Sequence, residues 1–298
     1  LLNEFNDPYM ENTTSNYMKI FALHMILSSA DCLGLLHNIP LKDATDLIMD
    51  SYVSGLFSAY PGGDGHVLYT FNAIQSLLTL GKLDLITSKM QQEIKQQIDG
   101  LFNDHGYFGD LHFREIDSRF IMSAVGALFI ISKHFNNTDL FLTLEQQNKI
   151  FDILCQLINK DGGSGADFQM ESHAANVFCM ICTLRMIGKQ LPESLLKPVK
   201  FYLLQRQTTT GGFNGRPEKL QDSCYSHWCG IPLQILEIDF SKELLREFLL
   251  NCYDERTGGF SDRPEDEPDL FHTHFSLGFL SGFPEYGLNQ LDLVLNVR

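Results

Sequence analysis

Apolar residues recur along this chain with the period of an α-helix. In residues 142–158 and 241–253 they stand at i, i+3, i+4 and i+7, which predicts amphipathic helices with one buried stripe. Residues 173–188 are apolar almost all round, which predicts a fully buried helix. No segment alternates convincingly between apolar and polar residues, so we expect an all-α protein without substantial strands.

A glycine-rich turn recurs about every fifty residues. An amphipathic helical segment precedes each turn, and a more apolar segment follows it after a short loop. The markers lie 51, 57, 49 and 47 residues apart, at Gly55, Gly106, Gly163, Gly212 and Gly259. Residues 16–37 read as a further buried helix without its preceding partner. The pattern therefore predicts a repeated helical hairpin.

Repeated helical hairpins form either an open superhelix or a closed ring. Second helices that are buried all round favour closure, so we predict an α/α barrel, or toroid, as one domain spanning residues 1–298. The alternative is an open solenoid of the HEAT type. In the closed form, the N-termini of all inner helices meet at one end, where their positive dipole ends attract anions.

Charge and composition exclude some functions. The formal net charge of −15 argues against nucleic-acid binding, because phosphate contacts need an excess of basic residues. No apolar run is long enough to span a membrane. Residues 1–14 are polar and acidic, unlike a secretory signal, and we expect the natural chain to start upstream because this one lacks an initial Met. Seven scattered cysteines suggest no disulfide framework, which favours a reducing, cytoplasmic location.

Polar residues keep a common register after the glycine markers. They stand 10 to 13 residues beyond each marker, at His66, Asp117, His173, Asp222 with Cys224, and Asp269 with His272. Each position falls at the start of a predicted inner helix. We therefore expect these side chains to converge on one rim of the barrel.

Asp222, Cys224 and His272 form a candidate zinc site. Zinc takes sulfur, nitrogen and oxygen ligands in tetrahedral geometry, and three protein ligands leave a fourth position open for a substrate. The alternative makes Asp222 a helix N-cap and Cys224 a small core residue.

Four residues near this triad form a candidate anion pocket: His173, Arg216, Lys219 and Tyr225. Arginine offers a bidentate fork and lysine a point charge for a phosphate group. The alternative is a solvated loop whose cations pair with Glu218 and Asp222. Arg119 either joins this rim or pairs with Asp117.

Phenylalanine is abundant, with 23 residues in the chain. Phe21, Phe71, Phe120 and Phe178 lie on predicted inner helices, so the barrel could accept a long apolar ligand. Ordinary core packing is the alternative for any one of them.

Two motifs carry a family resemblance. "GGFNGRPEKLQDSCYSHW" and "GGFSDRPEDEPDLFHTHF" resemble the β subunits of protein prenyltransferases, and most of all those of the type II, or Rab, geranylgeranyltransferases. The resemblance extends through "GHVLYTFNAIQSLLTL", "GDLHFREIDSRF" and "DGGSGADFQMESHAANVFC" and covers nearly the whole chain.

This resemblance implies an α/α barrel that pairs with a helical-repeat α subunit. Such an enzyme transfers an isoprenoid from its diphosphate to C-terminal cysteine thiols of small GTPases, in some cases with an escort protein. The motifs align Asp222, Cys224 and His272 with zinc ligands, and Asp262 with a residue linked to Mg²⁺. They align His173, Arg216, Lys219 and Tyr225 with diphosphate-binding residues, and Arg119 with a residue that lines the lipid and peptide cavity.

The resemblance leaves the length of the lipid open. Phe21 and Phe71 stand where bulk shortens the cavity toward a farnesyl group, whereas Met122 replaces a tyrosine of the farnesyl enzymes. Trp228 is a further substrate-binding candidate. Asp262 argues against the type I geranylgeranyltransferases, which do without Mg²⁺ and carry a lysine at this position. Because the length of the lipid is open, a type I geranylgeranyltransferase or a farnesyltransferase acting on CaaX proteins is the alternative.

Two other classes of protein fit the sequence less well. A terpene cyclase on the same barrel would need an Asp-rich DxDD motif, which is absent from the sequence. A non-catalytic helical scaffold predicts neither a metal site nor an aligned polar rim.

Overall fold

The structure, a computed structural model, describes residues 16–110 and 112–298. The expectations for residues 1–14 lie outside these ranges. None of the described helices is long and apolar enough to cross a membrane.

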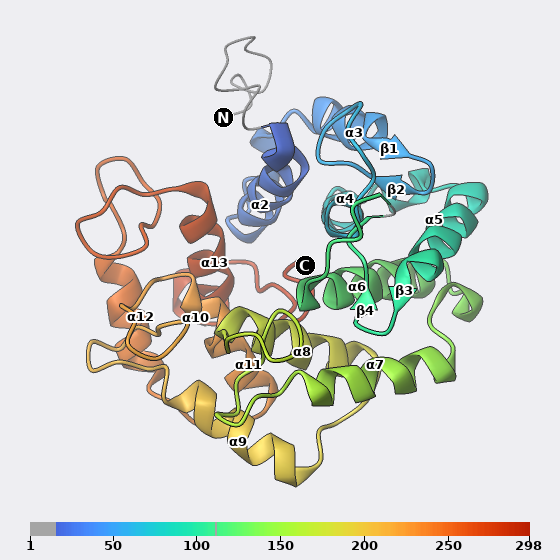
Figure 1. Cartoon of the computed structure of the whole chain (residues 1–298). Coiled ribbons are helices and arrows are strands. Elements are labelled where there is room, and N and C mark those ends of the chain that lie inside the picture. Colours follow the sequence, from blue (N-terminus) through green and yellow to red (C-terminus); the bar gives the residue numbers. More distant parts are fainter. Residues whose placement is uncertain (1–15, 111) are drawn as a thin grey trace.

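Helices in the described part of the chain form two concentric rings, which Figure 1 shows. The inner ring consists of α2 (Lys19–Cys32), α4 (Val67–Thr79), α6 (Ser118–His134), α8 (Ala174–Met186), the pair α10 (Tyr225–Trp228) and α11 (Gly230–Ile235), and α13 (Leu270–Leu280). The outer ring consists of α3 (Leu41–Asp50), α5 (Ser88–Leu101), α7 (Leu144–Gln156), α9 (Glu193–Leu204) and α12 (Lys242–Asn251). Helix α13 packs against α2 and closes the ring. The predicted α/α barrel is confirmed.

The apolar pattern explains which helix lies in which ring. In α8, every residue except Arg185 is buried, as a helix that is apolar all round requires. In the outer helix α5, only Gln91, Ile94, Ile98 and Leu101 are buried, which is one stripe at helical spacing. Outer helices therefore shield the inner ring with one face and meet solvent with the other.

The glycine-rich turns place each outer helix against its neighbour. Gly162 and Gly211 adopt positive φ angles of 87° and 92°. A Cβ atom at Gly162 would lie 2.1 Å from the carbonyl oxygen of Pro198, and one at Gly211 would lie 2.2 Å from that of Leu244. Only glycine tolerates both the positive φ angle and the close approach, which explains why it occupies these two positions.

Short strands and 3₁₀ turns complete the repeats. Two hairpins of two-residue strands, β1 (Tyr52–Val53) with β2 (Leu56–Phe57) and β3 (Phe102–Asn103) with β4 (Gly106–Tyr107), flank two of the turns. They are too short to produce the alternation by which strands are recognised. The 3₁₀ helices are η2 (Asn16–Met18), η3 (Leu36–Asn38), η4 (Leu83–Leu85), η5 (Thr138–Leu140) and η6 (Pro284–Tyr286).

One repeated hydrogen bond fixes the rim of the barrel. The first N–H group of an inner helix, or of the turn leading into it, donates to a carbonyl in the next repeat's loop. The distances are 2.9 Å for Val67 to Gly109, 2.7 Å for Ser118 to Ala166, 3.0 Å for Ala174 to Gly215 and 2.8 Å for Ser223 to Asp262. These bonds satisfy N–H groups that a helix leaves free, and they hold the N-termini of α4, α6, α8 and α10 at one end of the barrel.

The inner helix of the fourth repeat is broken, unlike the others. Residues 225–235 form two short pieces, α10 and α11, with Cys229 between them. Pro232 explains the break, since it lacks the N–H that would bond to the carbonyl of Trp228 four residues earlier.

The C-terminal residues cross the opposite end of the barrel, and Figure 1 shows the C-terminus inside the ring. The N–H of Asn289 donates to the carbonyl of Cys32 over 2.7 Å, and the Gln75 amide donates to the carbonyl of Leu295 over 2.6 Å. Asn296 and His274 are hydrogen-bonded over 2.6 Å. This segment ties α2, α4 and α13 together at the end away from the polar rim.

Candidate metal centre

Asp222, Cys224 and His272 meet at the rim where α10 and α13 begin. One ligand atom from each residue lies within 4.8 Å of the other two. His272 Nε2 is 3.4 Å from Asp222 Oδ1. The ring therefore brings together two loop residues and one from a helix that starts about fifty residues later.

Local hydrogen bonds orient this triad. Asp269 caps α13, with Oδ1 accepting from the backbone N–H of His272 over 2.9 Å. Its Oδ2 lies 2.6 Å from His272 Nδ1, which directs Nε2 toward Asp222. Asp222 Oδ1 in turn accepts from the backbone N–H of Cys224 over 2.8 Å. Sequence reasoning placed Asp269 on the rim without a role, although its spacing three residues before His272 was the available signal.

The three side chains influence one another's protonation. Burial lowers the pKa of His272, but hydrogen bonds to Asp222 and Asp269 outweigh burial and raise the pKa to about 9. Burial raises the pKa of Asp222, and hydrogen bonds from His272 and Cys224 more than offset this, so the net shift is downward. Burial and the Asp222 carboxylate raise the pKa of the Cys224 thiol well above its usual value.

These residues fit a zinc ion. Ligands of tetrahedral zinc lie about 2.0 to 2.3 Å from the metal, and so roughly 3 to 4 Å from one another, close to the separations found here. The Asp269–His272 contact is the carboxylate–histidine arrangement that orients metal-bound imidazoles. A cation would stabilise the Cys224 thiolate that burial and Asp222 oppose, and its binding would release protons.

His173 and Tyr225 form the core of the neighbouring anion-binding rim. His173 Nδ1 accepts from the N–H of Ala175 as the N-cap of α8, and Nε2 lies 3.1 Å from the Tyr225 hydroxyl. A Cβ at Gly215 would lie 2.3 Å from that hydroxyl, so only glycine lets the loop pass beneath the Tyr225 ring. Burial and the Arg216 charge lower the pKa of His173.

Arg216 and Lys219 lie on the loop beside this pair. The Arg216 guanidinium donates to the Glu171 carboxylate over 2.6 Å, rather than pairing with Glu218 or Asp222. The exposed ammonium of Lys219 makes no ion pair with any described residue. Sequence reasoning missed Glu171, two residues before His173, because its contact spans two repeats.

Arg119 and Asp262 have partners of their own. The Arg119 guanidinium donates to Asp117 over 2.7 Å, which was the alternative noted from sequence. Asp262 pairs with Arg263 over 3.0 Å, and its carbonyl accepts from the N–H of Ser223 beside the triad. Asp262 is thus near the metal centre without belonging to the group of three ligands.

The candidate lipid residues lie on inner helices. Phe71 and Met122 are buried on α4 and α6, while Phe21 on α2 is half-buried. A Cβ at Gly126 would lie 2.4 Å from the Phe71 ring, so this glycine makes room for the phenylalanine. Trp228 is half-buried against Phe178, Phe271 and Phe275, with ring centroids 5.8, 6.4 and 5.0 Å away.

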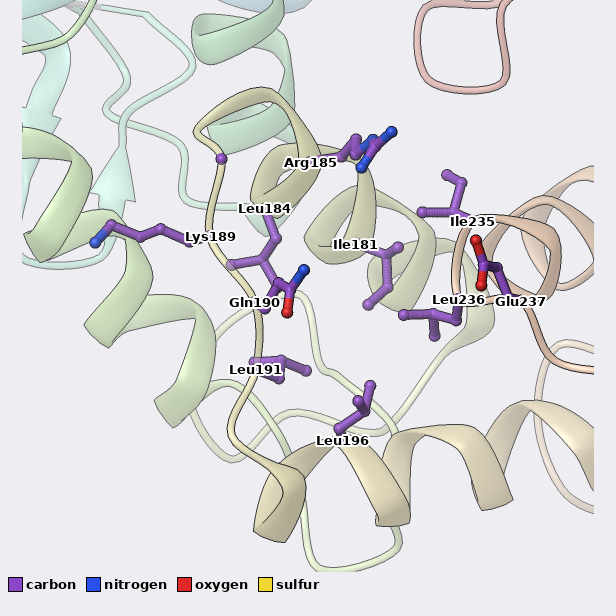
Figure 2. Close-up of a pocket in the computed structure, with 11 residues that line it drawn as sticks. Ile181, Leu184, Arg185, Lys189, Gln190, Leu191, Leu196, Ile235, Leu236 and Glu237 are labelled. Atoms are coloured by element: carbon purple, nitrogen blue, oxygen red, sulfur yellow. The ribbon is translucent and has the colours of Figure 1, made fainter.

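A separate cavity of about 390 Å³ opens between the C-terminal ends of α8 and α11 and the start of α9 (Figure 2). Ile181, Leu184 and Leu196 are among the apolar side chains that line it. None of the candidate site residues contributes to its wall. It is therefore distinct from the polar rim.

A barrel of paired helices with this rim defines a class of protein. Residues 1–297 match the family described as "Prenyltransferase alpha-alpha toroid domain", and the chain belongs to that family. It is 38% identical over 231 residues to a geranylgeranyl transferase type-2 subunit beta of Saccharomyces cerevisiae, covering 76% of this chain and 69% of that one. It is 32% identical to a Candida albicans type-2 subunit beta, with 80% and 73% coverage.

Three further matches broaden the comparison. A type-1 subunit beta of Arabidopsis thaliana is 31% identical, covering 76% of this chain and 61% of that one. The solved structure of Candida albicans protein geranylgeranyltransferase-I complexed with GGPP has a TM-score of 0.79 at 22% identity, covering 100% of this chain and 95% of the other. A type II terpene cyclase from Scytonema shares the fold with a TM-score of 0.64 at 12% identity, covering 91% and 88%. The chain is thus a homologue of geranylgeranyl transferase β subunits.

Proposed function

We propose that this chain is the catalytic β subunit of a zinc-dependent protein geranylgeranyltransferase of type II. Its substrates are geranylgeranyl diphosphate and the C-terminal cysteines of Rab-type small GTPases. The observation that carries the proposal is the Asp222, Cys224 and His272 group, which lies beside the His173–Tyr225 pair. The relatives from Saccharomyces cerevisiae and Candida albicans, both named as type-2 β subunits, support the assignment.

The reaction joins the cysteine sulfur to C1 of the isoprenoid while the bond from C1 to the diphosphate oxygen breaks. Bound zinc would supply a Lewis acid that keeps the acceptor thiol ionised near neutral pH. Asp222, Cys224 and His272 would hold that ion, and Asp269 would fix the orientation of the imidazole. Asp262 is the candidate for an auxiliary Mg²⁺.

The anion-binding rim acts on the leaving group. As the C–O bond breaks, negative charge gathers on the diphosphate, and donors already in place stabilise it. Tyr225 and His173 offer hydrogen bonds, and Lys219 and Arg216 offer positive charge. Glu171 keeps the Arg216 side chain extended until a diphosphate replaces it as partner. Arg119, Phe21, Phe71, Met122 and Trp228 line the space for lipid and peptide.

The enzyme works in the cytoplasm as a heterodimer with a helical-repeat α subunit, and an escort protein presents the GTPase. All seven cysteines are free, as expected in a reducing compartment. A type I activity toward CaaX proteins is the second candidate, favoured by the type-1 relative from Arabidopsis. The bulk of Phe21 and Phe71 favours a shorter lipid, so farnesyl diphosphate is a further candidate donor.

The proposal is tested by co-expressing the chain with its cognate α subunit. Zinc in the purified heterodimer is measured by mass spectrometry for the native chain, Cys224→Ala and the control Cys155→Ala, a half-buried cysteine on the outer helix α7. We expect about one zinc per heterodimer, lost only with Cys224. A folded heterodimer without zinc would refute the metal centre.

Transfer is then measured with farnesyl and geranylgeranyl diphosphates. The acceptors are a Rab protein with its escort and a CaaX protein. Geranylgeranyl transfer to the Rab protein supports type II, and transfer to the CaaX protein alone assigns type I. Absence of transfer to either acceptor by a zinc-loaded heterodimer contradicts the proposed activity.

A further inference from the structure

Arg206 is the one lysine or arginine that is buried in the part of the chain that the structure describes. It stands just after the last turn of the outer helix α9 and is only 6% exposed. A guanidinium group keeps its positive charge at any physiological pH. Taking such a group out of water is costly unless a carboxylate and hydrogen bonds compensate for the lost hydration.

The Arg206 guanidinium has no acidic partner within residues 16–110 and 112–298. Its Nε donates to the carbonyl of Tyr202 over 3.3 Å, and its carbon lies 4.9 Å from the centre of the Tyr202 ring. Its Nη1 is buried without a hydrogen-bond partner. The carboxylates of Asp161 and Glu171 act on Tyr202 electrostatically, but Asp161 is hydrogen-bonded within its own loop and Glu171 pairs with Arg216. The positive charge of Arg206 is therefore not neutralised locally.

The end of α9 supports the loop that carries the anion-binding residues. The carbonyl of Arg206 accepts from the backbone N–H of Asn214 over 2.9 Å, and the Tyr202 hydroxyl donates to the carbonyl of Gly215 over 3.1 Å. Gly215 in turn lies beneath the Tyr225 ring of the anion-binding rim. Asn214 Oδ1 is a buried acceptor without a donor, but it is neutral, so a bond to it would leave the Arg206 charge unbalanced.

The charge of Arg206 also acts on the far side of this loop. Burial raises the pKa of the Cys229 thiol, and the Arg206 charge opposes that rise. Cys229 Sγ lies 3.8 Å from the carbonyl oxygen of Asn214, and Cys229 directly follows α10, which begins at Tyr225. Solvent screens a buried charge less than an exposed one, so its influence extends further. A positive potential from Arg206 is therefore expected at the anion-binding rim.

From these observations we infer that Arg206 is a positioning residue for the diphosphate, which it does not touch. Its backbone holds the loop at residues 214–215, and its buried charge strengthens the attraction of the rim for the diphosphate. This inference rests on the proposed function. A ligand with several negative charges enters a protein of net charge −15, so the rim needs local positive charge that no carboxylate cancels. Glu171 partly neutralises Arg216, whereas Arg206 has no such partner.

The first test measures anion binding without catalysis. Inorganic pyrophosphate is titrated calorimetrically against the heterodimer with the native chain and with each variant. Arg206→Met keeps the length of the side chain but not its charge, so it should bind pyrophosphate about ten-fold more weakly. Arg206→Lys keeps the charge and should lose about three-fold or less. The control Arg185→Met makes the same change of charge at an exposed position near the end of α8, and its affinity should equal that of the native chain.

The second test separates this role from a purely structural one. A buried charge without a counter-ion destabilises a fold, so Arg206→Met should unfold at a urea concentration equal to or above that of the native chain. In transfer assays its KM for geranylgeranyl diphosphate should rise about ten-fold, while the KM for the acceptor protein and the zinc content stay unchanged.

The possible outcomes distinguish the inference from the proposed function. A lower urea midpoint together with raised KM values for both substrates would make Arg206 a structural residue and overturn the inference. Equal pyrophosphate affinity in the native chain, Arg206→Met and Arg185→Met would overturn it as well, and the proposed function would stand. A native heterodimer that neither binds pyrophosphate nor transfers a lipid would refute the proposed function, and the inference with it.

Discussion

Asp269 offers the sharpest test of how the metal centre is built. Its carboxylate performs two separable tasks, because Oδ1 caps α13 and Oδ2 holds the His272 ring at 2.6 Å. Asparagine caps a helix about as well as aspartate, but its amide oxygen is a weaker partner for the imidazole N–H. Asp269→Asn therefore removes the charge behind His272 while it preserves the helix terminus.

The expected loss of zinc affinity depends on which contact to His272 each substitution removes. Loss of a carboxylate behind a metal-bound histidine typically lowers metal affinity 10- to 100-fold. Because Asp269→Asn keeps a hydrogen bond, we expect the lower bound, about ten-fold or ~1.4 kcal/mol. Asp269→Ala also loses the cap, so zinc affinity should fall further and the free energy of unfolding should drop by about 1 kcal/mol.

Competition with a chelating dye measures zinc affinity, and urea denaturation measures stability. Asp117→Asn is the control, since Asp117 caps α6 in the same way but does not contact the triad. An Asp269→Asn heterodimer that binds zinc as tightly as the native protein would refute the orienting role. Equal losses in Asp269→Asn and Asp117→Asn would attribute the effect to capping instead.

Three further predictions concern the barrel and the anion rim. Gly126→Ala should destabilise the fold by about 1 to 2 kcal/mol in urea despite alanine's higher helix propensity, because its Cβ meets the Phe71 ring, and Phe71→Leu in the same chain should restore stability. Burial lowers the pKa of His24 to about 4, below the ordinary value of 6.5, so the unfolded chain binds more protons between those values. Stability should therefore fall by up to about 3 kcal/mol as pH drops from 6.5 to 4, with a smaller drop in His24→Gln than in the exposed control His37→Gln. Tyr225→Phe should lower kcat about ten-fold with little change in KM in single-turnover and steady-state assays, since it removes a donor that acts on the leaving group.

For each of these three predictions, one experimental outcome would contradict it. A Gly126→Ala protein as stable as the native one would mean that the Phe71 ring relaxes freely. Identical pH profiles for the two histidine variants would remove His24 from the acid sensitivity of the fold. A Tyr225→Phe enzyme that changes only KM would make the hydroxyl a general substrate contact.

The sequence by itself determined the repeat, the helical class and the common rim. Local spacing carries this information, because the period of apolar residues fixes helix faces and the glycines fix the turns. Asp222, Cys224 and His272 follow their glycine turns at similar distances in the sequence. Equivalent positions in repeated hairpins lie at the same end of the barrel, so their proximity could be predicted from spacing alone. The motif resemblance then suggested what those residues hold.

Only the tertiary structure decided which side chains pair across repeats. Arg216 reaches Glu171 and Asp269 orients His272, and neither contact follows from spacing alone because several carboxylates compete for each partner. The break at Cys229 depends on where Pro232 meets the carbonyl of the preceding turn. A hollow beside His66 likewise forms where residues 59–66 meet Asp110, Phe113 and Glu115 of the next repeat at the start of α4, a contact that no local pattern encodes.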